Sequence, residues 1–332
     1  MRKNILFTLL ALFGLSIVSY GQSTGIKSKQ TKYDCTVVVA SDLHFDLLPE
    51  TDQYYHVVAI NNLENHFRFP STAPKGIAST LLKKLDCVAL AGDMFDKSRP
   101  EILGLYRQRY EMGKGERRIH YNVFPGIGNH DINPAVSDKG ADNLKGRAYT
   151  FHYLDSVLNA KLKRGEILNL DASSRSYSWN VGGVHFVNGQ CCAGDTSYCK
   201  SNFEWLEKDL KKYASHGAPV VYIQHFGVDK ETLDWWPESS RVRLFGLLDR
   251  YNLAAFFAGH AHIATLETYK GHTVYQVNNA WKDSDGPGSF VVLRIKGNAV
   301  SAINCKVLDG KGTFEVAEPS INKVLPRWKT DK

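Results

Sequence analysis

Five short blocks of Asp, His and Asn occur along this 332-residue sequence. In order they read Asp42-Leu43-His44, Gly92-Asp93-Met94-Phe95-Asp96, Gly128-Asn129-His130-Asp131, His225 and Gly259-His260-Ala261-His262. Carboxylates, imidazoles and a neutral amide oxygen are ligands that suit iron, manganese and zinc, alone or as a mixed pair. Two such cations about 3.5–4 Å apart can clamp the oxygens of a phosphate ester and lower the pKa of a bridging water. The blocks therefore predict a two-metal site for phosphate ester hydrolysis.

Each block follows an apolar run that predicts a buried strand. The runs are rich in β-branched residues and cover residues 35–40, 87–91, 121–125, 220–224 and 253–258. Helical patterns over 77–85, 201–213 and 241–251 precede the second, fourth and fifth runs. Strands that alternate with helices indicate an α/β fold, in which ligands bind beyond the carboxyl ends of the strands. The five blocks are expected to meet there.

The pattern changes after residue 262. Four further strands, joined by turns that contain Gly and without helices between them, are predicted at 264–269, 273–277, 289–295 and 299–305. We expect them to form a second, more antiparallel sheet that packs against the first.

The ordered blocks resemble the signature of the calcineurin-like metallophosphoesterase family, D-x-H, G-D-x-x-D, G-N-H-D, H and G-H-x-H. The resemblance covers residues 42–262, about two-thirds of the chain. It implies an α/β fold, a four-layer α-β-β-α sandwich of two packed mixed sheets. It also implies two divalent or trivalent metal ions and a metal-bound hydroxide as the nucleophile.

The same resemblance implies a role for each block residue. The first metal would be bound by Asp42, His44 and His262, the second by Asn129, His225 and His260, with Asp93 bridging both. His130 would stabilise the transition state or protonate the leaving oxygen. Asp131 would orient His130, and Asp96 would fix the loop, with a catalytic role as the alternative.

Two differences from the motifs of known branches limit where in the family the chain fits. Asp96 stands where purple acid phosphatases have a Tyr, and the residues after it, Lys97-Ser98-Arg99, differ from the R-G of protein Ser/Thr phosphatases. The G-N-H-D form is similar to the bacterial phosphodiesterase branch, although monoesterases share it. Nothing after residue 262 resembles the large C-terminal domain of secreted 5′-nucleotidases.

Three tryptophans are candidates for substrate binding. Trp235 and Trp236 lie in the loop after His225, and Trp281 follows Asn278-Asn279-Ala280. Either these rings pack over the core, or at least one forms an apolar wall for the leaving group of the ester.

The first residues predict export. A basic start and a 15-residue apolar run over residues 5–19 precede small residues at Ser19 and Gly21, as in a cleaved signal peptide over 1–21. The run is too short for a comfortable membrane span, which favours cleavage over the alternative of a retained membrane anchor. We expect a mature chain that begins at Gln22, a flexible lead-in over 22–32 and a single domain over 33–332, in the periplasm or outside the cell.

The net charge of the chain limits which binding partners are expected. Cleavage would leave 39 basic and 34 acidic residues, a net charge of +5 without clusters of Lys or Arg. The expected substrate is a small or lipid-derived phosphate ester, and no nucleic acid is expected. A nuclease remains an alternative, as does a degenerate binding protein of the same fold at the cell surface. The second would be expected to lack a metal ligand, and the sequence lacks none.

Six cysteines in an exported chain are candidates for disulfides: Cys35, Cys87, Cys191, Cys192, Cys199 and Cys305. A disulfide within 191–199 and a set of free buried thiols are both open interpretations. The sequence leaves the pairing undecided.

Overall fold

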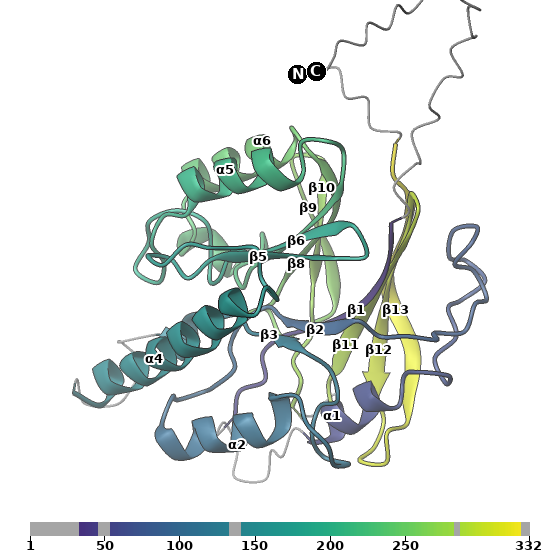
Figure 1. Ribbon diagram of the computed structural model, residues 1–332, viewed down its shortest axis with the longest axis horizontal. Coiled ribbons are helices and arrows are strands. Elements are labelled where there is room, and N and C mark those ends of the chain that lie inside the picture. The colour runs from purple at the N-terminus through teal and green to yellow at the C-terminus, as the bar shows by residue number, and fades with distance from the viewer. Residues whose placement is uncertain (1–32, 46–53, 133–140, 282–285, 327–332) are drawn as a thin grey trace, which may run out of the picture. The chain divides into compact units, whose positions relative to one another are not determined.

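Two mixed β-sheets packed face to face form the centre of the protein (Figure 1). The computed structural model describes residues 33–45, 54–132, 141–281 and 286–326. These described residues belong to one compact unit. The predicted leader over 1–21 and the lead-in over 22–32 lie outside the described residues, so they and the domain boundaries remain predictions.

The first sheet has six strands in the order β13-β12-β11-β1-β2-β3. Its strands are β1 (Asp34–Ala40), β2 (Cys87–Leu90), β3 (Val123–Phe124), β11 (Ser289–Lys296), β12 (Ala299–Val307) and β13 (Phe314–Val324). Strand β1 pairs in parallel with β2 and antiparallel with β11. Because β2 also pairs in parallel with β3, the carboxyl ends of β1, β2 and β3 lie at one edge.

The second sheet has seven strands in the order β4-β5-β6-β7-β8-β10-β9. Its strands are β4 (Asn169–Leu170), β5 (Tyr177–Val181), β6 (Val184–Asn188), β7 (Pro219–Ile223), β8 (Asn252–Ala258), β9 (Thr265–Tyr269) and β10 (His272–Gln276). Strand β7 pairs in parallel with both β6 and β8, so their carboxyl ends also point one way.

Helices cover the outer faces of both sheets. Figure 1 shows α5 (Phe203–Tyr213) and α6 (Glu238–Leu248) over the second sheet, and α1 (Tyr54–Asn61) and α2 (Pro100–Tyr110) over the first. The short α3 (Asn129–Ile132) and the long α4 (Ala141–Lys163) connect β3 to β4. The expected four-layer α-β-β-α arrangement is confirmed. Among the described helices, none combines the length and apolar character needed to cross a bilayer.

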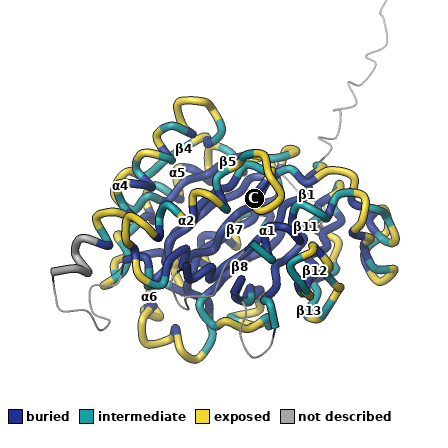
Figure 2. Tube along the Cα trace, turned by 90° about the horizontal axis from the view of Figure 1, so that it is seen from below, coloured by how far each residue is buried: buried dark blue, intermediate teal, exposed yellow. Residues whose placement is uncertain are grey.

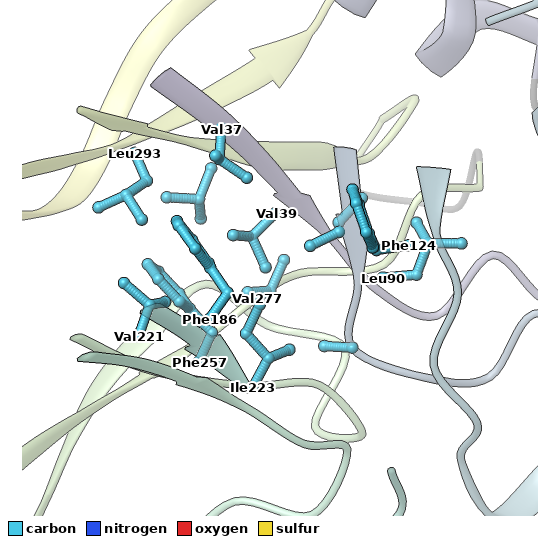
Figure 3. Close-up of a cluster of buried hydrophobic side chains, with 14 of the residues drawn as sticks. Val37, Val39, Leu90, Phe124, Phe186, Val221, Ile223, Phe257, Val277 and Leu293 are labelled. Atoms are coloured by element: carbon cyan, nitrogen blue, oxygen red, sulfur yellow. The ribbon is translucent and has the colours of Figure 1, made fainter. Parts of the chain in front are cut away.

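The core lies between the sheets, as the close-up shows (Figure 3). Side chains of the first sheet, including Val37, Val39 and Leu293, face Phe186 and Val221 of the second. All five are buried, and the strands form the buried interior of the chain trace in Figure 2. Each such side chain stabilises the fold by about 1.5–3 kcal/mol. This packing fixes the two sheets against each other, and with them the strand ends that carry the site.

Two local expectations are wrong. Residues 77–85 form no helix, because their backbone pairs with an earlier segment: the N–H of Phe69 donates to the carbonyl of Thr80, and the N–H of Leu82 to that of Phe67. The strands after residue 262 form no sheet of their own. Instead β9 and β10 extend the second sheet, and β11 and β12 join the first beside β1.

Candidate metal centre

The seven predicted metal ligands come together where the carboxyl ends of both sheets meet. Each lies just beyond one of β1, β2, β3, β7 and β8: Asp42, His44, Asp93, Asn129, His225, His260 and His262. Among these seven residues, two groups have ligand atoms within 4.8 Å of one another, Asp42 with His44 and His262, and Asp93 with His225 and His260, and a further group joins His44 to Asp96 and His130. The first two groups match the two sets expected from the sequence, except that the second expected set also includes the amide of Asn129.

The backbone at these positions is strained. Five of the predicted ligand residues have φ between 41° and 74°, namely Asp42, His44, Asp93, His260 and His262. A residue other than Gly in this left-handed region costs of order 1 kcal/mol or more, and such residues cluster at functional sites. The loops hold one another in place, since the N–H of Asp42 donates to Gly92 and that of His44 to Asp93.

Glycines in the motifs make room for the ligands. A Cβ atom added at Gly128 would lie 2.2 Å from Oδ1 of Asp93, and one added at Gly92 would lie 2.6 Å from the His225 ring. Real Cβ atoms do not approach neighbours so closely. The glycine of G-N-H-D is therefore required by the close approach of the β2 and β3 loops.

The first group surrounds a carboxylate oxygen of Asp42. Oδ1 of Asp42 lies 3.2 Å from Nε2 of His262 and 3.6 Å from Nε2 of His44. Nε2 of His44 also lies 3.5 Å from Oδ2 of Asp93, which links this group to the second.

In the second group, His225 shows why a cation fits. Its Nδ1 lies 3.0 Å from the carbonyl oxygen of Ala91, which can only accept, so Nδ1 carries a hydrogen. Nε2 then faces Oδ2 of Asp93 at 3.1 Å and Oδ1 of Asn129 at 3.0 Å. In a neutral imidazole this nitrogen is an acceptor facing two other acceptors. The conflict is resolved by a proton on Nε2, which the raised pKa of His225 favours in the absence of metal, or by a metal ion that replaces this proton and takes electron pairs from all three atoms.

Buried polar atoms without hydrogen-bond partners also indicate that a cation fits the site. Among the described residues, Oδ1 of Asp42, Oδ2 of Asp93 and the Nε2 atoms of His44 and His260 are buried without a hydrogen-bond partner. Such atoms are costly unless something binds them. The donor set therefore fits a site for divalent or trivalent cations.

The charges of the site also favour cations. Burial raises the pKa of Asp93, but the charges and hydrogen bonds of the surrounding histidines outweigh it and lower that pKa to about 2. Burial is likewise outweighed for Asp42, whose pKa lies well below its usual range because of His225 and His262. In the same field, the pKa of His225 rises to about 9, since the charges of Asp93 and Asp42 overcome the opposite effect of burial. Both carboxylates are ionised at neutral pH and attract positive charge into the site.

His130 lies beside the metal ligands, with its side chain 31% exposed. Its ring stands edge-on to that of His44, with centroids 4.6 Å apart. Nδ1 of His130 lies 3.2 Å from Oδ1 of Asp96, which is also 3.6 Å from Nδ1 of His44. Asp96 thus orients the His130 ring, a contact that the loop-fixing interpretation of this residue does not include, whereas Nδ1 of His44 is buried without a hydrogen-bond partner among the described residues.

Asp131 does not contact the His130 ring, so the predicted orienting role is wrong. Its carboxylate is buried and accepts hydrogen bonds from the N–H groups of Gly128, Met94 and Phe95. Burial and the nearby charge of Asp93 raise the pKa of Asp131 to about 7. Asp131 links the loops that follow β2 and β3, and Asp96 instead has the role of orienting His130 that was expected of Asp131.

Comparison with known sequences shows the family of the chain. The sequence model of the family described as calcineurin-like phosphoesterase matches residues 35–264, more than half of the chain. The chain belongs to the calcineurin-like phosphoesterases. Members of this family are metal-dependent hydrolases of phosphoric esters. Among curated proteins, none matches the sequence.

Two solved structures resemble the phosphoesterase in fold, and a third aligns with it at a lower TM-score. The GAP50 anchor of the inner membrane complex of Plasmodium has a TM-score of 0.54 at 13% identity, with 90% of this chain and 91% of that chain covered. A dimetal phosphatase from Danio rerio has a TM-score of 0.51 at 11% identity, with 81% and 95% covered. Vacuolar Protein Sorting 29 from Cryptosporidium parvum has a TM-score of 0.39 at 14% identity, with 88% and 100% covered.

The three tryptophans of the phosphoesterase separate into two kinds. Trp236 is fully buried, and its Nε1 donates to the carbonyl of Ala193, so it packs in the core and the prediction that it binds substrate is wrong. Trp235 is 42% exposed, with its ring centroid 5.0 Å from that of His260. Trp281 is 7% exposed and lies 4.7 Å from His44 and 4.6 Å from His262. An aromatic ring therefore flanks each ligand group.

Two further aromatic residues support Trp235. The ring of Tyr198 lies 5.9 Å from Trp235, and that of Phe226 lies 5.8 Å from it. The sequence carries no signal for Tyr198, because it lies 37 positions from Trp235 and only the fold brings them together.

Proposed function

We propose that this phosphoesterase hydrolyses a small or lipid-derived phosphate ester at a centre of two metal ions. The observation that carries the proposal is the position of Asp93. Its Oδ2 lies 3.5 Å from Nε2 of His44 in one group and 3.1 Å from Nε2 of His225 in the other. A single carboxylate oxygen shared by two ligand groups is what a pair of cations about 3.5–4 Å apart requires.

Each metal would be held by one ligand group. Asp42, His44 and His262 would hold one ion and Asn129, His225 and His260 the other, with Asp93 shared. When bound, the ions polarise the phosphoryl oxygens and activate a water as nucleophile. The chain's own residues bind and orient these parts and exclude bulk water from the buried side, where Asp42, Asp93 and His225 are fully buried.

His130 would supply the proton for the leaving group. Asp96 holds Nδ1 of the ring, which leaves Nε2 to face the substrate from the more exposed side of the site. An imidazolium held in this way can donate its Nε2 proton to the departing oxygen as the ester bond breaks.

Trp235 and Trp281 would form apolar walls on the two sides of the centre. They contact His260 on one side and His44 and His262 on the other. Pockets for small ligands combine apolar walls with a few polar groups that fix orientation. Such walls favour an ester whose leaving group is bulky and apolar over a small one.

The G-N-H-D form and the first residues of the chain support two finer proposals. One is a place in the secreted bacterial phosphodiesterase branch of the family. The other is export, with cleavage before Gln22.

The experiment is a substrate screen of the mature protein. Aryl phosphate monoesters and diesters are supplied with Fe, Mn or Zn added in turn, and product release and bound metal are both measured. We expect turnover that requires metal, and a higher kcat/KM for an aryl ester than for a methyl ester of the same phosphate. Stoichiometric metal without turnover of any ester would instead support a binding protein.

A further inference from the structure

Three cysteines gather beside the metal centre, in the segment between β6 and α5. Cys191 and Cys192 are buried and Cys199 is half-buried. The Sγ atoms of Cys192 and Cys199 lie 2.7 Å apart. Non-bonded carbon atoms rest about 3.5–4.0 Å apart, and sulfur is larger. The two sulfur atoms are thus closer than two separate thiols would stay.

The local backbone holds this pair together. Oγ1 of Thr196 accepts hydrogen bonds from the N–H groups of Tyr198 and Cys199, at 3.1 and 3.0 Å. The N–H of Thr196 in turn donates to the carbonyl of Cys199. These bonds fold the segment back on itself and place Cys199 against Cys192.

We propose that Cys192 and Cys199 form a disulfide that fixes the aromatic wall of the active site. Each thiol gives up one hydrogen, and the two electrons pass to the disulfide of a thiol oxidoreductase or of oxidised glutathione, which is reduced to two thiols. The oxidising compartment that the reaction needs is the one expected from the leader. Cys191 stays a thiol.

The other cysteines are placed differently. Cys35, Cys87 and Cys305 are buried within β1, β2 and β12 of the first sheet. Burial raises the pKa of each of these thiols, which keeps them protonated and slow to react.

The role of the disulfide follows from what the loop touches. Tyr198, the neighbour of Cys199, packs on Phe226 and Trp235, with ring centroids 5.5 and 5.9 Å away. The carbonyl of Ala193, the neighbour of Cys192, accepts the hydrogen bond of Trp236. Closing the loop covalently fixes Tyr198, and with it Trp235 beside His260. This positioning role rests on the proposed function, whereas the bond itself does not.

Peptide mapping tests the bond directly. The full-length protein is incubated with oxidised glutathione, so that the result does not depend on export, and free thiols are then alkylated. Trypsin leaves all three cysteines in residues 176–200, and cleavage before Asp195 separates Cys199 from the other two. Fragments 176–194 and 195–200 should stay joined until a reductant is added. The thiol count should be four of six.

The Cys191→Ser variant identifies the partner. It should keep the fragments joined, because Cys191 takes no part. Joined fragments that separate in Cys191→Ser but persist in Cys192→Ser would show that Cys191 is the partner. Alkylation of both Cys192 and Cys199 in the unreduced wild type would show that no bond forms. Either result overturns the proposal, and the mapping of the wild type does not depend on how well a variant folds.

Kinetics test the positioning role. Reduction, or Cys199→Ser, should raise KM several-fold for a bulky aryl ester and leave bound metal and kcat for a methyl ester unchanged. If the bond is mapped but its reduction changes neither ester, the wall-positioning role is wrong. If no ester is turned over by either form, the proposed function fails and the mapped bond still stands.

Discussion

Asp96 offers the most informative single substitution, because one carboxylate contacts both His130 and His44. The two contacts measure 3.2 and 3.6 Å, and the side chain of Asp96 is only 15% exposed. Loss of an outer carboxylate from a metal site costs about 10–100-fold in activity or metal affinity, and a positioned acid contributes about 10²–10⁴-fold. We expect Asp96→Asn to lower kcat/KM by about 10–100-fold, or about 1.4–2.7 kcal/mol, which is less than the loss in His130→Ala.

The substitution should also change the pH profile. Burial lowers the pKa of His130, but the hydrogen bond with Asp96 and the charge of Asp93 raise it above its usual value. An acid that works as an imidazolium loses activity as the pH rises through its pKa, so a raised pKa extends activity to higher pH. Without the carboxylate, the alkaline limb of the kcat/KM profile should move to lower pH.

The assay is steady-state hydrolysis of an aryl phosphate from mildly acidic to alkaline pH, with bound metal measured in each sample. Asp249→Asn is the matched control, because it breaks another Asp–His pair, with His272 at 3.0 Å, outside the metal centre. An alkaline limb that does not move in Asp96→Asn would refute the reasoning. Full multiplication of the two single losses in Asp96→Asn/His130→Ala would refute it as well, since Asp96 would then act independently of His130.

Three further predictions concern the tryptophans, a buried histidine and the leader. Trp236→Ala should lower the free energy of unfolding by about 3–5 kcal/mol, as measured by urea denaturation. Trp235→Ala should keep the melting temperature and lower kcat/KM only for bulky esters. Equal losses of kcat/KM on large and small esters would contradict the proposal that Trp235 forms an apolar wall. Burial lowers the pKa of His56 from 6.5 to about 4, so between these pH values the unfolded chain binds more protons than the folded chain. The free energy of unfolding should therefore fall by about 3 kcal/mol as the pH drops from 6.5 to 4. His56→Gln should flatten this dependence of stability on pH, and an unchanged dependence would show that His56 does not cause it. Mass analysis of the protein from its native host should find a chain that begins at Gln22, and a chain that retains Met1 would contradict export.

The meeting of the seven predicted ligands at one site could be predicted because each lies next to a local signal. An apolar run such as 35–40 or 253–258 forms a strand from its own composition, and the polar block that ends it must lie at the end of that strand. The sequence alone did not reveal that these ends belong to two different sheets, because strand pairing depends on partners far along the chain. The family resemblance supplied the sandwich.

The expectations that differ from the structure concern residues that are adjacent in sequence but not in space. Asp131 follows His130 in α3, and successive helical residues point in different directions, so the two side chains do not meet. Asp96 is 34 positions away from His130 and provides the contact instead. Trp235 and Trp236 likewise differ because the core accepts only one of the two rings.

Metal stoichiometry tests the central claim most directly. The wild-type protein, purified with metal and freed of excess, should contain two ions per chain. Asp93→Asn should lose both, because its carboxylate faces both ligand groups, whereas His260→Ala should lose one and His130→Ala none. Two ions retained in Asp93→Asn, or a single ion in the wild type, would contradict a centre bridged by Asp93.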